Sequence, residues 1–374
     1  MQTRSKIAFA SLLVLLGPLF CCCELWAQQI SDPKSKSVSL GLLLEDSLMV
    51  EARYGAEFAV EEINRKGGLD GRPIALSVKS MEGPWGVGSK QAVDLVFDQE
   101  VWALIGALKG RNSHLVEQVA AKTDVPFVSA WAADPTLSKS YVPQFFNCVP
   151  NSEQQARAIL AEMIENRGFD KWILVSDQDY DSRIAVESLL KMDACKKSPP
   201  SKQIKCNSSD DFETLIETIK EEKPTALILF CEPELNLELI LKLRSYPELI
   251  PVYTSLSLLH EQTFSRLVSN RFEEVYFVES GKWMTQRDSD FVRRFKDEFG
   301  RDPGAMAAYG YDAIQIVARA IENSGSDPKK LKQSLSKSSY SGRTGFVEFD
   351  RLGNRKSILP LDVVSSEVLY LSKP

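Results

Sequence analysis

The side chains best suited to acid–base, nucleophilic or metal chemistry are scarce in this chain of 374 residues. Its two histidines are His114 and His260, and its cysteines lack the paired C-x-x-C spacing of a structural zinc site. The sequence also contains no G-x-S-x-G nucleophile elbow and no phosphate-binding P-loop. We therefore expect no catalytic centre, no metal and no cofactor, which leaves binding without chemistry as the role to test.

The later cysteines either form disulfides, as an oxidising compartment allows, or remain as buried thiols. Cys195 and Cys206 flank a loop rich in Lys, Ser and Pro, and an exported protein can form a disulfide there. We predict a Cys195–Cys206 disulfide, with two free thiols as the alternative. Cys148 and Cys231 lie in apolar, strand-like segments, so we expect them to be buried thiols.

The first residues have the pattern of a secretory signal peptide. A positively charged start precedes an apolar run over residues 7–20 that is short for a membrane span. We expect cleavage after Ala27, so that residues 1–27 are a signal peptide and the mature chain is exported to the periplasm. The three consecutive cysteines at 21–23 leave a lipoprotein anchor as the alternative.

Composition excludes one class of partner. The formal net charge is −6, whereas nucleic-acid binders usually present a basic face. With 44% hydrophobic residues, the chain is long enough for two globular domains with ordinary cores.

Alternating strand and helix patterns indicate the elements that position the candidate residues. The segment around Ala52, Ala56 and Ala59 has one apolar helix face, and Gly67 and Gly68 follow it as a C-terminal cap. The segments that we expect to be strands are 38–44, 74–78, 102–105, 126–129, 172–175, 226–230 and 275–278, with a further strand near 252. Helical patterns lie between them and restart near residue 156. This order predicts an α/β protein with two doubly wound parallel-sheet lobes.

Four segments, in this order, resemble the type I periplasmic solute-binding proteins that capture branched-chain amino acids. They are AVEEINRKGGLDGRPI at 59–74, VWALIGALKGRNS with DVPFVSAWAADP at 101–135, MAAYGYDAIQIVARAIENSGSDP at 306–328, and GRTGFVEFDRLGNRK at 342–356. The resemblance implies two lobes joined by three crossovers, near 148–152, 280–283 and 344–349. Lobe one would comprise 38–149 and 281–343, and lobe two 150–280 and 345–374.

The resemblance also implies a mechanism and partners. Such proteins close two lobes around a small-molecule ligand by hinge motion and present it to an ABC permease in the inner membrane. We expect a monomer that binds no nucleic acid.

In this family the ligand carboxylate is held by a serine and backbone amides at a helix N-terminus, where N–H groups lack partners. The serine position falls on Gly110 here, so backbone donors remain but the hydroxyl is lost. Arg111 or Ser113 could replace it, and Asn112 lies in the same loop; a solvated surface role is the alternative for Arg111. The family's second contact, an Ala-Thr pair, falls on Ala132 and Ala133.

The family's third anchor is an acid that pairs with the ligand ammonium, and it falls on Leu256, beside Ser255. An unpaired ammonium in a closed cleft costs roughly 2–5 kcal/mol. Glu232 or Asp181 could substitute for the missing acid; a helix cap is the alternative for Asp181.

Three aromatic side chains complete the expected ligand site. Tyr180 is adjacent to Asp181 in the sequence. Trp131 and Trp85 could line the cleft, with packing at the lobe edge as the alternative for Trp131. The resulting hypothesis is an import receptor for a small polar or carboxylate-bearing solute, with a ligand sensor of the same fold as the alternative.

Overall fold

The computed structural model describes residues 37–84, 86–270, 272–279, 281, 284, 290–356 and 363–369. The predicted signal peptide with its cysteines at 21–23 lies outside the described residues, as do Trp85 and residues 280, 282 and 283 of the second predicted crossover. Those predictions stay open.

The first of two large sheets consists of five parallel strands in the order β2-β1-β3-β4-β5. The strands are β1 (Val38–Leu44), β2 (Ile74–Ser80), β3 (Ala103–Ala107), β4 (Phe127–Ser129) and β5 (Phe145–Asn147). The helices that accompany it are α2 (Val50–Arg65), α3 (Val87–Phe97), α4 (Gly110–Thr123), α5 (Thr136–Lys139), α12 (Asp290–Phe299), α13 (Ala305–Asn323) and α14 (Leu331–Leu335). The central strands are apolar throughout because helices cover both faces of a parallel sheet.

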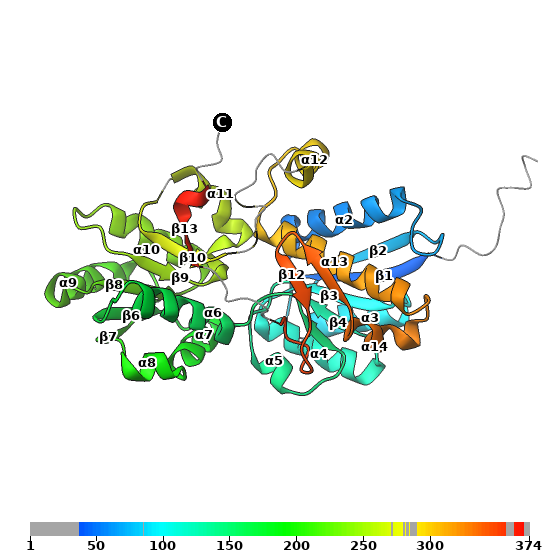
Figure 1. Cartoon of the computed structure of the whole chain (residues 1–374), viewed down its shortest axis with the longest axis horizontal. Coiled ribbons are helices and arrows are strands. Elements are labelled where there is room, and N and C mark those ends of the chain that lie inside the picture. Colours follow the sequence, from blue (N-terminus) through cyan, green and yellow to red (C-terminus); the bar gives the residue numbers. More distant parts are fainter. Residues whose placement is uncertain are drawn as a thin grey trace, which may run out of the picture. The chain divides into compact units, whose positions relative to one another are not determined.

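The second sheet has the strand order β13-β10-β9-β8-β6-β7 and is parallel except for β13, which runs antiparallel to β10. Its strands are β6 (Trp172–Ser176), β7 (Lys202–Lys205), β8 (Ala226–Phe230), β9 (Val252–Thr254), β10 (Val275–Val278) and β13 (Val363–Ser365). Its helices are α6 (Ser152–Leu160), α7 (Tyr180–Leu190), α8 (Asp193–Lys197), α9 (Phe212–Glu222), α10 (Pro233–Arg244) and α11 (Glu261–Asn270). The predicted α/β class with two parallel-sheet lobes is therefore confirmed (Figure 1).

Short elements complete the chain. They are the π-helical turn η2 (Ala161–Asn166), the 3₁₀ turns η3 (Ser209–Asp211), η4 (Leu256–Leu259), η6 (Pro328–Lys330) and η7 (Ser366–Leu369), and the hairpin β11 (Ser339–Gly342) with β12 (Gly345–Glu348).

Three segments predicted as crossovers meet around one buried arginine. The Arg355 guanidinium is 7% exposed and donates from Nη1 to the Cys148 carbonyl at 2.8 Å and from Nη2 to the Thr344 carbonyl at 2.6 Å. Gly281 has a φ of 99°, and a Cβ there would lie 2.2 Å from the Arg343 carbonyl oxygen. The backbones around residues 148, 281 and 344 are therefore neighbours, which supports our proposal that the lobe boundaries fall there.

The predicted Cys195–Cys206 disulfide is wrong, because both cysteines are free and buried. Cys195 packs in the cluster that contains Trp172 and Leu174, whereas Cys206 packs in the cluster that contains Ile173. Successive residues of a strand point to opposite faces of a sheet. Strand β6 therefore separates the two thiols.

The helices α2 and α13 pack with their backbones in contact, although they come from opposite ends of the described chain (Figure 1). A Cβ on Gly55 would lie 1.9 Å from the Ala307 carbonyl oxygen, and one on Gly310 would lie 2.4 Å from the Ala52 carbonyl oxygen. The two glycines therefore set the approach of α13, the helix that completes the first lobe.

We predict that Gly55→Ala and Gly310→Ala each lower the free energy of unfolding by about 1–3 kcal/mol, because the new methyl group meets backbone that cannot rotate away. Urea unfolding monitored by circular dichroism measures this. Gly88→Ala in α3 is the matched control, since its methyl meets the terminal methyl of Met81, which can move. Equal losses in all three variants would contradict the backbone contact.

Candidate functional site

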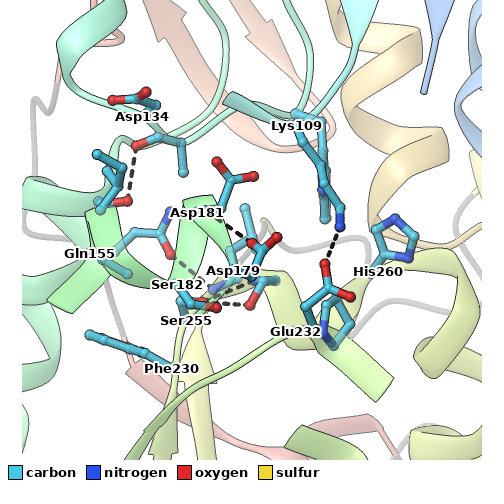
Figure 2. Close-up of a pocket in the computed structure, with 18 of the residues that line it drawn as sticks. Lys109, Asp134, Gln155, Asp179, Asp181, Ser182, Phe230, Glu232, Ser255 and His260 are labelled. Atoms are coloured by element: carbon cyan, nitrogen blue, oxygen red, sulfur yellow. Dashed lines mark hydrogen bonds and ion pairs between the residues drawn. The ribbon is translucent and has the colours of Figure 1, made fainter. Parts of the chain in front are cut away.

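A cavity lies where the carboxyl ends of strands from both sheets meet, the usual ligand position in open α/β sheets. Figure 2 shows side chains from both lobes that line it. About 80 Å³ is open to the centres of water molecules. Its polar lining residues are Lys109, Asp134, Ser152, Gln155, Asp179, Asp181, Ser182, Glu232, Ser255, Ser257 and His260.

Helix α4 presents its N-terminus beside this cavity. Its N-cap, Lys109, provides no side-chain cap, and the Lys109 N–H donates to Glu45 Oε2 at 2.9 Å. The next donor, the Gly110 N–H, lies 3.1 and 3.2 Å from the two carboxylate oxygens of Asp181, which belongs to the second lobe. A side chain of the protein thus binds the amide that, by the family resemblance, would bind the ligand carboxylate.

The glycine at position 110 is what makes room for this contact. A Cβ on Gly110 would lie 2.6 Å from Asp181 Oδ1 and 2.9 Å from the Cβ of Asp134. A serine at this position, which the family resemblance implies, could not coexist with Asp181 as it is placed here.

Asp181 is held in an unusual electrostatic environment. Burial raises the pKa of its carboxyl to about 7; the Gly110 N–H opposes this shift and the nearby Asp179 adds to it. Asp179, rather than Asp181, caps helix α7, since it accepts the Asp181 N–H at 3.0 Å. Asp181 does not cap its own helix α7, but it accepts the first N–H of α4 across the cavity, so the helix-cap alternative holds for a helix of the other lobe.

An ion pair joins the two lobes on another side of the cavity. The ammonium group of Lys109 binds the carboxylate of Glu232 (Figure 2). Burial alone would lower the pKa of Lys109, but the hydrogen bond and charge of Glu232 outweigh burial and raise it. The Lys109 ammonium is therefore a cation that is already paired with a carboxylate.

Asp134 is the centre of a third polar group. Tyr180 donates its hydroxyl to Asp134 Oδ2 at 2.8 Å, and His114 Nε2 lies 3.1 Å from the same oxygen. Hydrogen bonds to Asp134 and Glu117 raise the pKa of His114 to about 9, against the effect of burial. His114 is therefore protonated at neutral pH and compensates the charge of Asp134.

His260 behaves in the opposite way. Burial, and then the charge of Lys109, lower its pKa to about 4, so its ring is neutral at neutral pH. The ring lies edge-on to Trp131 with centroids 6.0 Å apart. These two rings form an uncharged part of the cavity wall.

The residues predicted from sequence divide into two groups. Trp131, Ala133, Asp181, Glu232, Ser255 and Leu256 line the cavity. The others do not appear in its lining: Gly110 and Tyr180 bind lining carboxylates, Asn112 binds Glu45 at 2.6 Å, Arg111 is exposed, and Ala132 and Ser113 are buried.

Sequence reasoning missed Lys109, Asp134, Asp179, Gln155 and His260. Their common signal is position, because Lys109, Asp134 and Asp179 each follow the carboxyl end of a strand. Gln155 was not recognisable in this way, since it lies on α6 and accepts the Leu256 N–H at 2.9 Å.

Comparison with known proteins agrees with this arrangement. Residues 45–361 match the family model described as "Periplasmic binding protein". The chain belongs to the periplasmic binding protein family. The prediction made from the four sequence segments is thereby confirmed.

Solved structures of the family have the same fold. The branched-chain amino acid transporter substrate-binding protein LivJ of Streptococcus pneumoniae, in complex with isoleucine, has a TM-score of 0.73, 20% identity and coverage of 88% of this chain and 100% of its own. A leucine complex of an ABC transporter substrate-binding protein from Desulfitobacterium hafniense has a TM-score of 0.75, 20% identity and coverage of 88% and 97%. Both likenesses show the fold alone.

Curated relatives include a plant receptor. Glutamate receptor 3.7 of Arabidopsis thaliana is 25% identical over 280 residues, which are 72% of this chain and 30% of that receptor. The chain thus spans about a third of the length of the curated relatives that it matches.

Membrane-spanning helices and clustered metal ligands are both absent from the described residues. None of their helices is both long and apolar enough to cross a bilayer. The same residues contain no group of three or more His, Cys, Asp or Glu side chains placed to hold a metal ion.

The two histidines give a direct test of the site's electrostatics. We predict that the ring of His114 titrates near pH 9 and that of His260 near pH 4, measured by NMR of the imidazole C–H protons. Because the pKa of His114 is raised on folding, its stabilising contribution is complete below pH 6.5 and is lost as the pH rises through about 9.

For His260 the pKa falls on folding, so its contribution is present above pH 6.5 and is lost as the pH falls through about 4. The variants His114→Gln and His260→Gln assign the two signals. Two rings that both titrate near pH 6.5 would contradict the described hydrogen bonds and burial.

Proposed function

We propose that the protein is an extracytoplasmic solute-binding receptor of an ABC-type importer, which captures a small polar, amino-acid-like or amide-like solute between two lobes. The observation that carries the proposal is the cavity bounded by the carboxyl ends of both sheets, with side chains of both lobes in its wall. Membership of the periplasmic binding protein family supports the same role.

The contacts across the cavity support capture by closure. Asp181 binds the first turn of α4, Glu232 binds Lys109, and the Glu261 carboxylate accepts the Glu51 N–H of α2 at 2.9 Å. Each bond joins a residue of the first lobe, at or near the start of a helix, to a residue of the second, so separating the lobes breaks all three. A hinge at the segment around Arg355 would allow such a motion without chemistry.

Location and partners belong to the same proposal. The predicted signal peptide and the family favour the periplasm, and substrate-binding neighbours of ABC transporters imply a permease as the membrane partner. We propose a monomer that delivers its solute by docking to that permease.

A second candidate is a sensor that reports ligand binding to a membrane signalling partner. The match to plant glutamate receptors favours it, since those relatives are named as receptors. Neighbouring genes discriminate the two roles: permease and ATPase genes favour import, and a histidine kinase gene favours sensing.

We predict that at least one solute from a set of amino acids, amines, short-chain amides, urea and aromatic acids stabilises the protein against heat. At one hundred times the dissociation constant, binding adds about 2.7 kcal/mol, which raises the Tm by roughly 5–10 °C. Differential scanning fluorimetry measures the shift, and small-angle X-ray scattering of the same samples measures closure. A set in which no solute raises the Tm would contradict a solute receptor.

A further inference from the structure

We infer that the cavity selects a small solute through a primary ammonium group and does not accept carboxylates that lack one. The inference rests on the proposed solute-binding function and names the charge of the group that the site recognises. Three observations carry it: the occupied amide at α4, the charges around the cavity, and the size and wall of the space that is left.

The anion-binding end of α4 already holds a carboxylate. The Gly110 N–H is bonded to both oxygens of Asp181, and the Lys109 N–H is bonded to Glu45. A solute carboxylate that bound the Gly110 N–H would have to displace the part-buried side chain of Asp181. It would also lie beside Asp134, whose Cβ approaches the Cβ position of residue 110 to 2.9 Å.

The charges in the wall favour a cation. The lining carboxylates are those of Asp134, Asp179, Asp181 and Glu232. The cations that face them are Lys109, which binds Glu232, and His114, which binds Asp134. In the lining itself, four carboxyl groups face one lysine, and an anionic solute would add to this excess of acidic groups.

The acidic groups that form no ion pair come from one segment of the chain. Within the described part of the chain, neither Asp179 nor Asp181 forms an ion pair, and both line the cavity. The charge of Lys109 opposes the raised pKa of Asp181 without cancelling the effect of desolvation, and Lys109 itself is bound to Glu232. An ammonium group placed between these side chains would supply a cationic partner and donate hydrogen bonds to both.

Asp179 and Asp181 could also replace the acidic residue that the family resemblance implies at position 256. Leu256 stands where relatives carry the acid that pairs with the ligand ammonium, and its N–H is bound to Gln155. Asp179 and Asp181, from the loop after β6, provide carboxylates on the same cavity instead. The ammonium contact is therefore placed after β6 and not at the position of Leu256.

The remaining wall fits a short aliphatic body. Trp131, Phe230, Ile184 and Ala185 line the cavity, and His260 beside them is uncharged at neutral pH. Putrescine and ethanolamine combine a primary ammonium group with a short aliphatic chain and serve as probes.

The test uses solutes matched in size and differing in charge. Putrescine is compared with 1,4-butanediol and succinate, and ethanolamine with ethylene glycol and glycolate, by calorimetry and thermal shift on the same protein. We expect binding by at least one amine, and no binding by its neutral or anionic partner at the same concentration.

Two conservative variants test whether Asp179 and Asp181 bind the ammonium group. Asp179→Asn and Asp181→Asn keep an oxygen that can accept the same backbone N–H, so we expect both to fold, and circular dichroism with urea unfolding verifies this. Each is expected to weaken amine binding at least tenfold. Asp210→Asn is the matched control, since Asp210 is exposed and outside the cavity, and its affinity should equal that of the parent protein.

The outcomes separate this inference from the receptor function. Binding of succinate or glycolate, equal binding of a diol and its amine, or full amine affinity in both aspartate variants would overturn the ammonium assignment and leave the receptor intact. Failure of all six probes also overturns the assignment. In that case the receptor function stands if another solute in the wider thermal-shift set binds, and falls with it if none does.

Discussion

The first turn of a helix leaves backbone N–H groups without hydrogen-bond partners. In this protein, carboxylates of the second lobe accept such N–H groups from two helices of the first lobe. Neither α2 nor α4 has a side-chain cap of its own. Glu261 accepts the Glu51 N–H, and Asp181 accepts the Gly110 N–H. Because an uncapped and buried helix end is costly, these two carboxylates couple the contact between the lobes to the backbone of the first lobe.

The same constraint links residue 110 to residue 181 across the cavity. Removing the side chain at 110 makes space for Asp181, and Asp181 then supplies the negative charge that the helix end attracts. The N-terminus of α4 is therefore occupied by a carboxylate of the protein, and four carboxyl groups line the cavity beside it.

Most of the fold could be predicted from sequence, because it depends on local periodicity and on caps. The alternation of β1, α2 and β2 follows from the apolar face of 52–63 and the glycines at 67 and 68. The disulfide prediction failed because proximity along the chain does not reveal that β6 lies between Cys195 and Cys206. The packing of α13 on α2 was predictable only through the family resemblance, since no local pattern pairs Gly55 with Gly310.

The site was predictable only in part. The resemblance pointed to Leu256, and Asp181 and Glu232 were named as substitutes for a missing acid; all three line the cavity, and Gly110 binds one of them. The bond between Gly110 and Asp181 joins residues 71 apart, and nothing in either loop indicates that they meet. The protonated state of His114 likewise depends on Asp134 and Glu117, which the fold brings to its two ring nitrogens.

The most direct test of the account is a crystal structure of the protein with the solute that binds it most tightly. We predict that Asp181 remains on the Gly110 amide and that the nitrogen of the solute lies within hydrogen-bonding distance of Asp179 or Asp181. A solute carboxylate bound to the Gly110 amide, with Asp181 displaced from the end of α4, would contradict it.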